Sequence, residues 1–457
     1  MKGFARPNWC IAVLGCAVAA LVLSCAASVS RGGENGTITV ALGGPRGLAT
    51  GWPDTSLPTF SSVTVTVSAT DMDTVTSTAS GFSGSISVKA PAGNDRLVEV
   101  IAVPAPNGGA PLFAKSYYGS ATVDLEEGQQ TTAQIALSLG ESKLVLFDFD
   151  GENGYLSIAD SISGSVTQPD ALFLGGYLTF ALDQYGRGFI GTNALDRYTS
   201  LNDFETLQTG AEVHAVTYDA SRNILYSIEE GQTMDFIYRD LATDTELNLD
   251  APLDFSFTDN RGFVLAAADG HLYAPIIVNE TFGVGKIAVT PGAQSAQATL
   301  ADFITLAALG MDGTPGYNFG DMLVKDGVLY ILANNLIISP YVDHLVSKGK
   351  IIAVDAATMT GPLWTAGDTT EVFPSIANKN TRFYGPIRFV GVAPKKLYIA
   401  DEGFYWQETE VFPSNVSNID RVVEVDLEKR AITGTGFEGE VGFFSDLSGY
   451  QVLALTP

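Results

Sequence analysis

Cysteine is almost absent from this sequence. Its 457 residues contain three cysteines, Cys10, Cys16 and Cys25, and none follows Cys25. Most of the chain therefore offers no disulfide bond and no thiolate for catalysis or zinc binding. The chain also has no G-x-S-x-G elbow and no Walker loop.

Histidine and positive charge are scarce as well. The three histidines, His214, His271 and His344, have no metal-ligand spacing in the sequence, and we expect no catalytic role for them. Lys and Arg number 25 against 51 Asp and Glu, which gives a net charge of −26. Such a surface repels phosphate groups, so we expect no nucleic acid partner.

The apolar run near the start, from Trp9 to Leu23, is shorter than the about 20 residues that a membrane-spanning helix needs. Lys2 and Arg6 precede it, and this arrangement is typical of a secretory signal. We predict that residues 1–24 are a signal peptide of an exported protein.

The run ends in "VLSC", residues 22–25, which resembles the lipobox of bacterial lipoproteins. The resemblance implies a diacylglycerol on Cys25, cleavage before it, and further acylation with chains such as palmitate. Ala26 follows, which in the best-known Gram-negative sorting scheme implies the outer membrane. Residues 25–35 would then be the lipidated cysteine and a flexible tether. An ordinary cleaved signal or an uncleaved anchor is the alternative.

Composition predicts an all-β protein with a large core. Hydrophobic residues make up 46% and charged residues 17%, and glycine occurs 48 times among many Thr, Val and Ser residues. In residues 36–141 apolar and polar residues alternate, as in "SVTVTVSA" and "GSISVKA", which is typical of half-buried strands. About seven such strands predict an antiparallel β-sandwich, similar to immunoglobulin-like or transthyretin-like modules, that acts as a spacer.

Residues 142–457 contain a repeat. Four segments carry an apolar "LY" strand after a turn, around Tyr226, Tyr273, Tyr330 and Tyr398, and each precedes a second apolar strand. A weaker copy begins at Tyr185. Together with the two ends of the region, which would complete one further blade, they predict a β-propeller of about six blades.

The repeats resemble the NHL, YVTN and SMP-30 types of propeller, with "YDASRNILYSIEEG" as the most similar stretch. Such propellers include lactonases, lyases, scaffolds and ligand sensors, so the resemblance implies the fold and leaves the function open.

Two long loops, 334–349 and 401–419, are predicted to lie on one face of the propeller. Aromatic side chains beside carboxylates suit sugars, cations or a protein partner. We therefore predict a ligand- or partner-binding site from these loops, comprising Tyr341, Asp343, His344, Asp401, Glu402, Phe404, Tyr405 and Trp406.

The main hypothesis is a lipid-anchored binding or scaffolding protein without a cofactor, whose partners are the membrane and an unknown protein, small molecule or carbohydrate. One alternative is a metal-dependent hydrolase or lactonase with a divalent ion at channel-mouth carboxylates; a purely structural envelope protein is the other. The stretch "DFDGENG" at 148 resembles a calcium loop, but Asn153 and Ala159 replace the required Gly and Glu. A hairpin turn is the favoured interpretation there.

Overall fold

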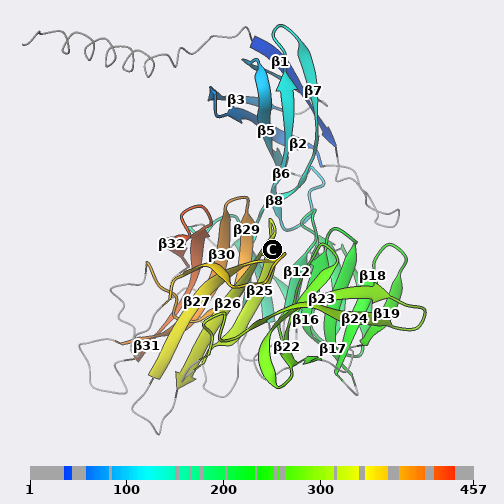
Figure 1. The fold of residues 1–457 in the computed structure, drawn as a ribbon, viewed down its shortest axis with the longest axis vertical. Helices are drawn as coiled ribbons and strands as arrows, with labels where there is room; N and C mark the ends of the chain where they lie inside the picture. Colours follow the sequence, from blue (N-terminus) through cyan, green and yellow to red (C-terminus); the bar gives the residue numbers. More distant parts are fainter. Residues whose placement is uncertain are drawn as a thin grey trace, which may run out of the picture.

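A computed structural model shows an all-strand architecture (Figure 1). Among the described residues there is no helix long and apolar enough to cross a membrane. The structure describes residues 35–43, 58–81, 85–106, 108–149, 154–163, 167–174, 179–200, 203–231, 234–250, 255–257, 263–312, 316–338, 345–368, 380–406 and 416–437.

The first eight strands form two sheets that share one hydrophobic core. One sheet has the order β4 (Ser85–Pro91), β1 (Asn35–Gly43), β7 (Gln130–Ala136). The other has the order β3 (Met72–Ser80), β2 (Phe60–Ala69), β5 (Gly93–Pro104), β6 (Ala114–Leu125), β8 (Ser138–Ser142).

The predicted alternation in these strands is confirmed. Val63, Val65 and Val67 of β2 are fully buried, as are Ile38 and Val40 of β1. One detail of the prediction is wrong, because β1 pairs with β7 in parallel. β1 and β7 are the first and last strands of that sheet in chain order, and no hairpin joins them. Nothing therefore forces them to run in opposite directions.

Further antiparallel sheets follow in chain order. A nine-stranded sheet in the middle consists of two neighbouring sets of strands, within residues 212–250 and 255–305, and the last strand of the first set pairs in parallel with the last strand of the second. The strands are β9 (Leu144–Phe149), β10 (Gly154–Ala159) and β11 (Thr167–Leu174); β12 (Thr179–Leu182), β13 (Gly188–Gly191), β14 (Ala194–Ser200) and β15 (Asp203–Thr209); β16 (Glu212–Asp219), β17 (Ile224–Glu230), β18 (Met234–Asp240) and β19 (Thr245–Asp250); β20 (Phe255–Phe257), β21 (Ala266–Ala268), β22 (His271–Val278), β23 (Thr281–Pro291) and β24 (Ala296–Thr305); β25 (Asn318–Lys325), β26 (Val328–Ile338), β27 (Leu345–Asp355) and β28 (Pro362–Ala366); and β29 (Pro386–Ala393), β30 (Lys396–Trp406), β31 (Val416–Asp426) and β32 (Ala431–Gly436).

The inner strands of successive sets contact one another in the order β12, β16, β21, β25, β29, and β29 also contacts β8 and β9. Side chains link these strands: Thr179 Oγ1 accepts a hydrogen bond from the Val216 amide, and Ser142 Oγ accepts one from the Val392 amide. Sheets arranged around a centre in this way make the body propeller-like, and the first two sheets lie at one end of it (Figure 1).

The four predicted "LY" segments all form the first strand of an antiparallel hairpin: β17–β18, β22–β23, β26–β27 and β30–β31. In two sets the preceding turn is Asp–Gly, and both residues have positive φ, 49° and 77° at Asp269–Gly270. This conformation suits a two-residue hairpin turn, which explains why the strand begins at the next residue. The hairpin predicted around Glu152 is confirmed by the pairing of β9 with β10.

The predicted loops 334–349 and 401–419 are shorter than expected. β26 pairs with β27 as far as Ile338–Leu345, and β30 pairs with β31 as far as Trp406–Val416. Branched and aromatic residues at these positions favour strand, so both hairpins continue outward from the body. The segment predicted to close the first blade, from Phe443 onward, lies outside the described residues.

Candidate functional site

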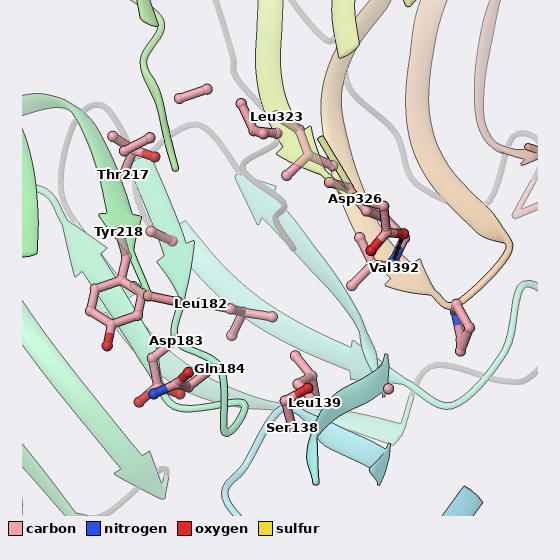
Figure 2. A pocket seen from close by; sticks show the side chains of 18 of the residues that line it. Ser138, Leu139, Leu182, Asp183, Gln184, Thr217, Tyr218, Leu323, Asp326 and Val392 are labelled. Atoms are coloured by element: carbon pink, nitrogen blue, oxygen red, sulfur yellow. Dashed lines mark ion pairs between the residues drawn. The ribbon is translucent and has the colours of Figure 1, made fainter. Parts of the chain in front are cut away.

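A cavity of about 660 Å³ lies where the first two sheets meet the propeller-like body. Its walls come from the C-terminal ends of β12, β16, β25 and β29, with β21, and from β5, β6 and β8 on the other side. Figure 2 shows Leu139, Leu182, Leu323 and Val392 around this space. The volume falls within the range of ligand pockets. The lining combines apolar side chains with polar and charged groups in similar measure, among them Tyr118, Asp183 and Asp321.

Asp321 is one of the acidic groups in the cavity wall whose pKa is raised. It follows Gly320 at an irregularity in the β25–β26 ladder. Its Oδ1 accepts the Met322 amide at 2.8 Å and its Oδ2 accepts the Phe389 amide of β29 at 3.0 Å. Burial raises the pKa of Asp321 to about 6, although Arg388, 3.9 Å away, acts in the opposite direction.

A carboxyl group with this pKa titrates near neutral pH, which is a property of functional sites more often than of ordinary surface carboxylates. Each carboxylate oxygen also has a second lone pair, so Asp321 can accept a further hydrogen bond while it holds the two backbone amides.

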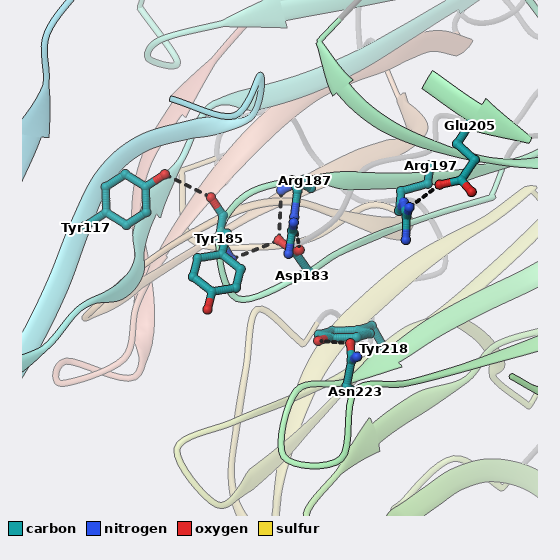
Figure 3. A network of polar contacts seen from close by, with 8 residues as sticks. All are labelled: Tyr117, Asp183, Tyr185, Arg187, Arg197, Glu205, Tyr218 and Asn223. Carbon is teal, nitrogen blue, oxygen red and sulfur yellow. Dashed lines mark hydrogen bonds and ion pairs between the residues drawn. The ribbon is translucent and has the colours of Figure 1, made fainter. Parts of the chain in front are cut away.

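A second buried carboxylate, Asp183, holds the turn between β12 and β13 (Figure 3). It accepts hydrogen bonds from the Tyr185 amide at 2.8 Å and from the Arg187 amide at 2.9 Å, and it forms an ion pair with the Arg187 side chain at 2.5 Å. Burial raises the pKa of Asp183, and Arg187 and the two amides act against this. These contacts give the carboxylate a structural role in the cavity wall.

The same turn ties the wall to the first two sheets. Tyr117 Oη of β6 donates a hydrogen bond to the Tyr185 carbonyl at 3.1 Å, and the Leu139 amide donates one to the Gln184 carbonyl at 2.6 Å. Because Leu139 and Gln184 line the cavity, contacts of the junction contribute to its shape.

Across the cavity, Tyr118 Oη donates a hydrogen bond to Glu99 at 2.8 Å, and burial raises the pKa of Tyr118. Lys395, also at the wall, is directed to Glu428 at 2.8 Å, and both of these side chains are exposed. The Lys395–Glu428 pair at the rim therefore stays solvated, whereas Asp183 is buried and the Asp321 side chain is only 13% exposed.

The sequence-predicted residues Asp401 and Glu402 lie on β30, and both are buried. Asp401 accepts hydrogen bonds from the Tyr384 and Gly385 amides and from Arg421, whose Nε lies 2.9 Å and Nη2 2.8 Å from Oδ2. Both side chains of this ion pair are 0% exposed. The described contacts thus give Asp401 a structural role, which holds the segment before β29 against β30.

Among the residues that the structure describes, no side-chain contact joins the other predicted site residues. Tyr341, Asp343 and His344 lie outside the described residues, as do the tips of both hairpins. Phe404, Tyr405 and Trp406 are placed in β30, opposite Asn418, Ser417 and Val416. Ligand binding by this set of residues stays a prediction.

Sequence reasoning missed the cavity and also a group of three side chains at the other end of β16. Glu212, His214 and Glu230 place one ligand atom each within 4.8 Å of one another. The signal in the sequence was the Glu-x-His pattern on one strand with a glutamate in the hairpin partner strand. Its meaning depends on the register of β16 and β17, which pairs Glu212 with Glu230.

Comparison with known proteins gives a family match over part of the chain. Residues 292–451 match the TdpA C-terminal domain, which is less than half of the chain. No curated protein matches the chain.

Among solved structures, a protein of unknown function from Bacteroides thetaiotaomicron VPI-5482 is 15% identical, with 81% of this chain and 78% of that chain covered and a TM-score of 0.36. A puromycin hydrolase is 11% identical, with 72% and 48% covered and a TM-score of 0.30, so the chain spans about half of that enzyme. Apo AztD from Citrobacter koseri is 10% identical, with 83% and 95% covered and a TM-score of 0.28. With TM-scores this low, the fold assignment rests on the sheets described above.

Proposed function

We propose that this chain is an exported ligand-binding protein of the cell envelope, anchored through lipid on Cys25, that takes a small molecule into the junction cavity. The observation that carries the binding role is the 660 Å³ cavity with Asp321 in its wall. Residues 22–25 support the anchor, because they resemble a lipobox. We also propose that the first two sheets are an immunoglobulin-like sandwich and that the body has six blades.

The chemistry of the wall indicates the ligand class. Leu182, Leu323 and Val392 suit an apolar body, and Asp321 suits one donor group such as an amine or hydroxyl. An acidic ligand would meet the net charge of −26 and the carboxylate of Asp183 in the same cavity wall, so anions are disfavoured.

A hydrolase with a metal in this cavity is less well supported. Such an enzyme needs several carboxylates or amides converging at about 2.0–2.6 Å on one ion. Among the described residues, the metal-ligating side chains that come together in a group of three are Glu212, His214 and Glu230, and none of them lines this cavity.

A thermal-shift screen tests the binding role, because a ligand that binds only the folded state raises its stability. Amines, neutral alcohols and sugars, and small acids would be compared on the wild type, on Asp321→Asn, and on Asp244→Asn, a control at an exposed turn outside the cavity lining. We expect amines or alcohols to raise Tm in the wild type and in Asp244→Asn, and to lose most of this effect in Asp321→Asn. If no class raises Tm, or if acids alone do so, the proposal is wrong.

The anchor has its own test. Metabolic labelling with a fatty acid should mark the wild type, and Cys25→Ser should lose the label and be released from the membrane. Persistence of the label in Cys25→Ser would contradict lipidation without affecting the cavity.

A further inference from the structure

Two glutamates face each other at the end of β16 that is distant from the cavity. Glu212 begins β16 and pairs directly with Glu230 at the end of β17. Like charges directly opposite one another on antiparallel strands destabilise a sheet. In the described part of the chain, no hydrogen bond or ion pair engages the Glu212 carboxylate. The pair therefore needs a positive partner that the neighbouring backbone does not supply.

His214 lies beside this pair at an irregularity in the ladder between Val213 and Ala215. Bulges of this kind re-aim side chains and occur often at functional positions. The imidazole Nε2 lies 2.8 Å from Glu230 Oε2, and the side chain is only 8% exposed. Its ring stacks on Phe263, with centroids 4.8 Å apart and an interplanar angle of 30°. Packing therefore fixes the ring with one nitrogen directed at the carboxylates.

We propose that Glu212, His214 and Glu230 form a site for a divalent transition-metal ion of the Zn²⁺ class, separate from the junction cavity. One imidazole nitrogen with two carboxylate oxygens is a ligand set that Zn²⁺ accepts, whereas Ca²⁺ prefers oxygen ligands alone. Three protein ligands leave the fourth position to water, as in open zinc sites.

The distances allow the site to form with small movements. Two atoms that each lie about 2.1 Å from a common ion are at most about 4.2 Å apart. The three ligand atoms already lie within 4.8 Å of one another, and Glu230 is 52% exposed and can rotate toward the others. The buried His214 ring does not need to move.

Equilibrium titration of the purified full chain with Zn²⁺, Mn²⁺ and Ca²⁺ tests the proposal. We expect saturable binding of one Zn²⁺ per chain and at least tenfold weaker affinity in Glu212→Gln, Glu230→Gln and His214→Ala. His271→Ala removes an imidazole from the next set of strands and should bind like the wild type. Binding unaffected by all three changes, preference for Ca²⁺, or equal loss in His271→Ala would overturn the proposal.

X-ray absorption of the Zn²⁺-loaded wild type provides a second test that depends on no variant. The expected shell contains one imidazole nitrogen and oxygen ligands. A sulfur ligand would instead place the ion on Cys10, Cys16 or Cys25, and an all-oxygen shell would exclude His214; either result refutes the site.

Discussion

The ring of Phe113, in the turn immediately before β6, packs edge-on against the ring of Phe180 in β12, with centroids 4.9 Å apart and an interplanar angle of 86°. Phe113 is fully buried, and it belongs to a core cluster formed mainly by the propeller-like body. Its amide donates a hydrogen bond to Gly186 and its carbonyl accepts one from Lys143. One side chain thus joins the first two sheets to the rest of the molecule, directly beside the cavity.

Phe113→Ala should uncouple these two parts. Removing a buried phenylalanine costs about 3–5 kcal/mol of the free energy of unfolding. We expect calorimetry to show one cooperative transition for the wild type and two transitions, or a lower Tm, for the variant. Leu363→Ala, which truncates a side chain that is 51% exposed, is the control and should leave the trace unchanged. An unchanged transition in Phe113→Ala would show that the junction does not depend on this ring.

Gly188→Ala should disturb the packing of Phe113 against Phe180, because Gly188 lies against both rings. A Cβ at residue 188 would lie 2.4 Å from Phe113 Cε2, closer than real Cβ atoms approach other atoms. Overpacking of this kind costs about 1–3 kcal/mol. Phe113→Leu in the Gly188→Ala background should recover part of the loss, and chemical unfolding of the four proteins measures the coupling. Strict additivity of the two changes would contradict the contact.

Asp321 should make stability depend on pH. Its pKa is raised from 3.8 to about 6, so between these values the folded protein holds a proton that the unfolded chain has released. Its contribution to stability is therefore present below about pH 4 and is lost as the pH rises through about 6. A shift of about two units corresponds to about 3 kcal/mol.

The corresponding measurement is urea unfolding of the wild type and Asp321→Asn from pH 4 to pH 7. In Asp321→Asn the free energy of unfolding should decline less with rising pH than it does in the wild type. Asp326→Asn alters a carboxyl group that is 75% exposed and should keep the pH dependence of the wild type. Equal slopes in Asp321→Asn and the wild type would mean that Asp321 is not buried as described.

Asp401→Ala should destabilise the fold strongly, because it removes the carboxylate that forms a fully buried ion pair with the Arg421 guanidinium. Breaking a buried ion pair from one side costs about 3–5 kcal/mol. Glu428→Gln breaks the exposed pair with Lys395 and should be close to neutral in the same chemical unfolding measurement. If Asp401→Ala instead unfolds like the wild type and abolishes binding of a ligand, Asp401 belongs to a binding site as the sequence predicted.

The sequence was sufficient for features that depend on neighbouring residues. Alternation in "SVTVTVSA" predicts which side of β2 is buried, and the Asp269–Gly270 turn predicts where β22 begins. Local patterns also indicate the four "LY" hairpins, since the two strands of each are consecutive along the chain.

Features that depend on distant segments could not be predicted. Phe113 follows a turn-forming stretch, and nothing near it in the sequence indicates that it packs against Phe180. The pKa of Asp321 is raised by burial, and the β29 amide of Phe389 that contacts it comes from a distant part of the chain. Asp401 was assigned to a loop although Arg421 lies opposite it in a ladder. Burial and charge pairing across strands arise from the arrangement of the sheets, which a single sequence does not specify.

A variant with a filled cavity tests the central claim most directly. Ala267→Phe places a ring from β21 into the junction cavity, and Leu363→Phe adds a ring at the exposed position on β28 as the matched control. Isothermal titration with the most stabilising amine or alcohol from the screen would be carried out on both variants and on the wild type. The account predicts one site per chain, at least tenfold weaker binding in Ala267→Phe, and unchanged binding in Leu363→Phe. Equal affinity in Ala267→Phe and the wild type, with both proteins folded, would show that the ligand binds elsewhere and would contradict the account.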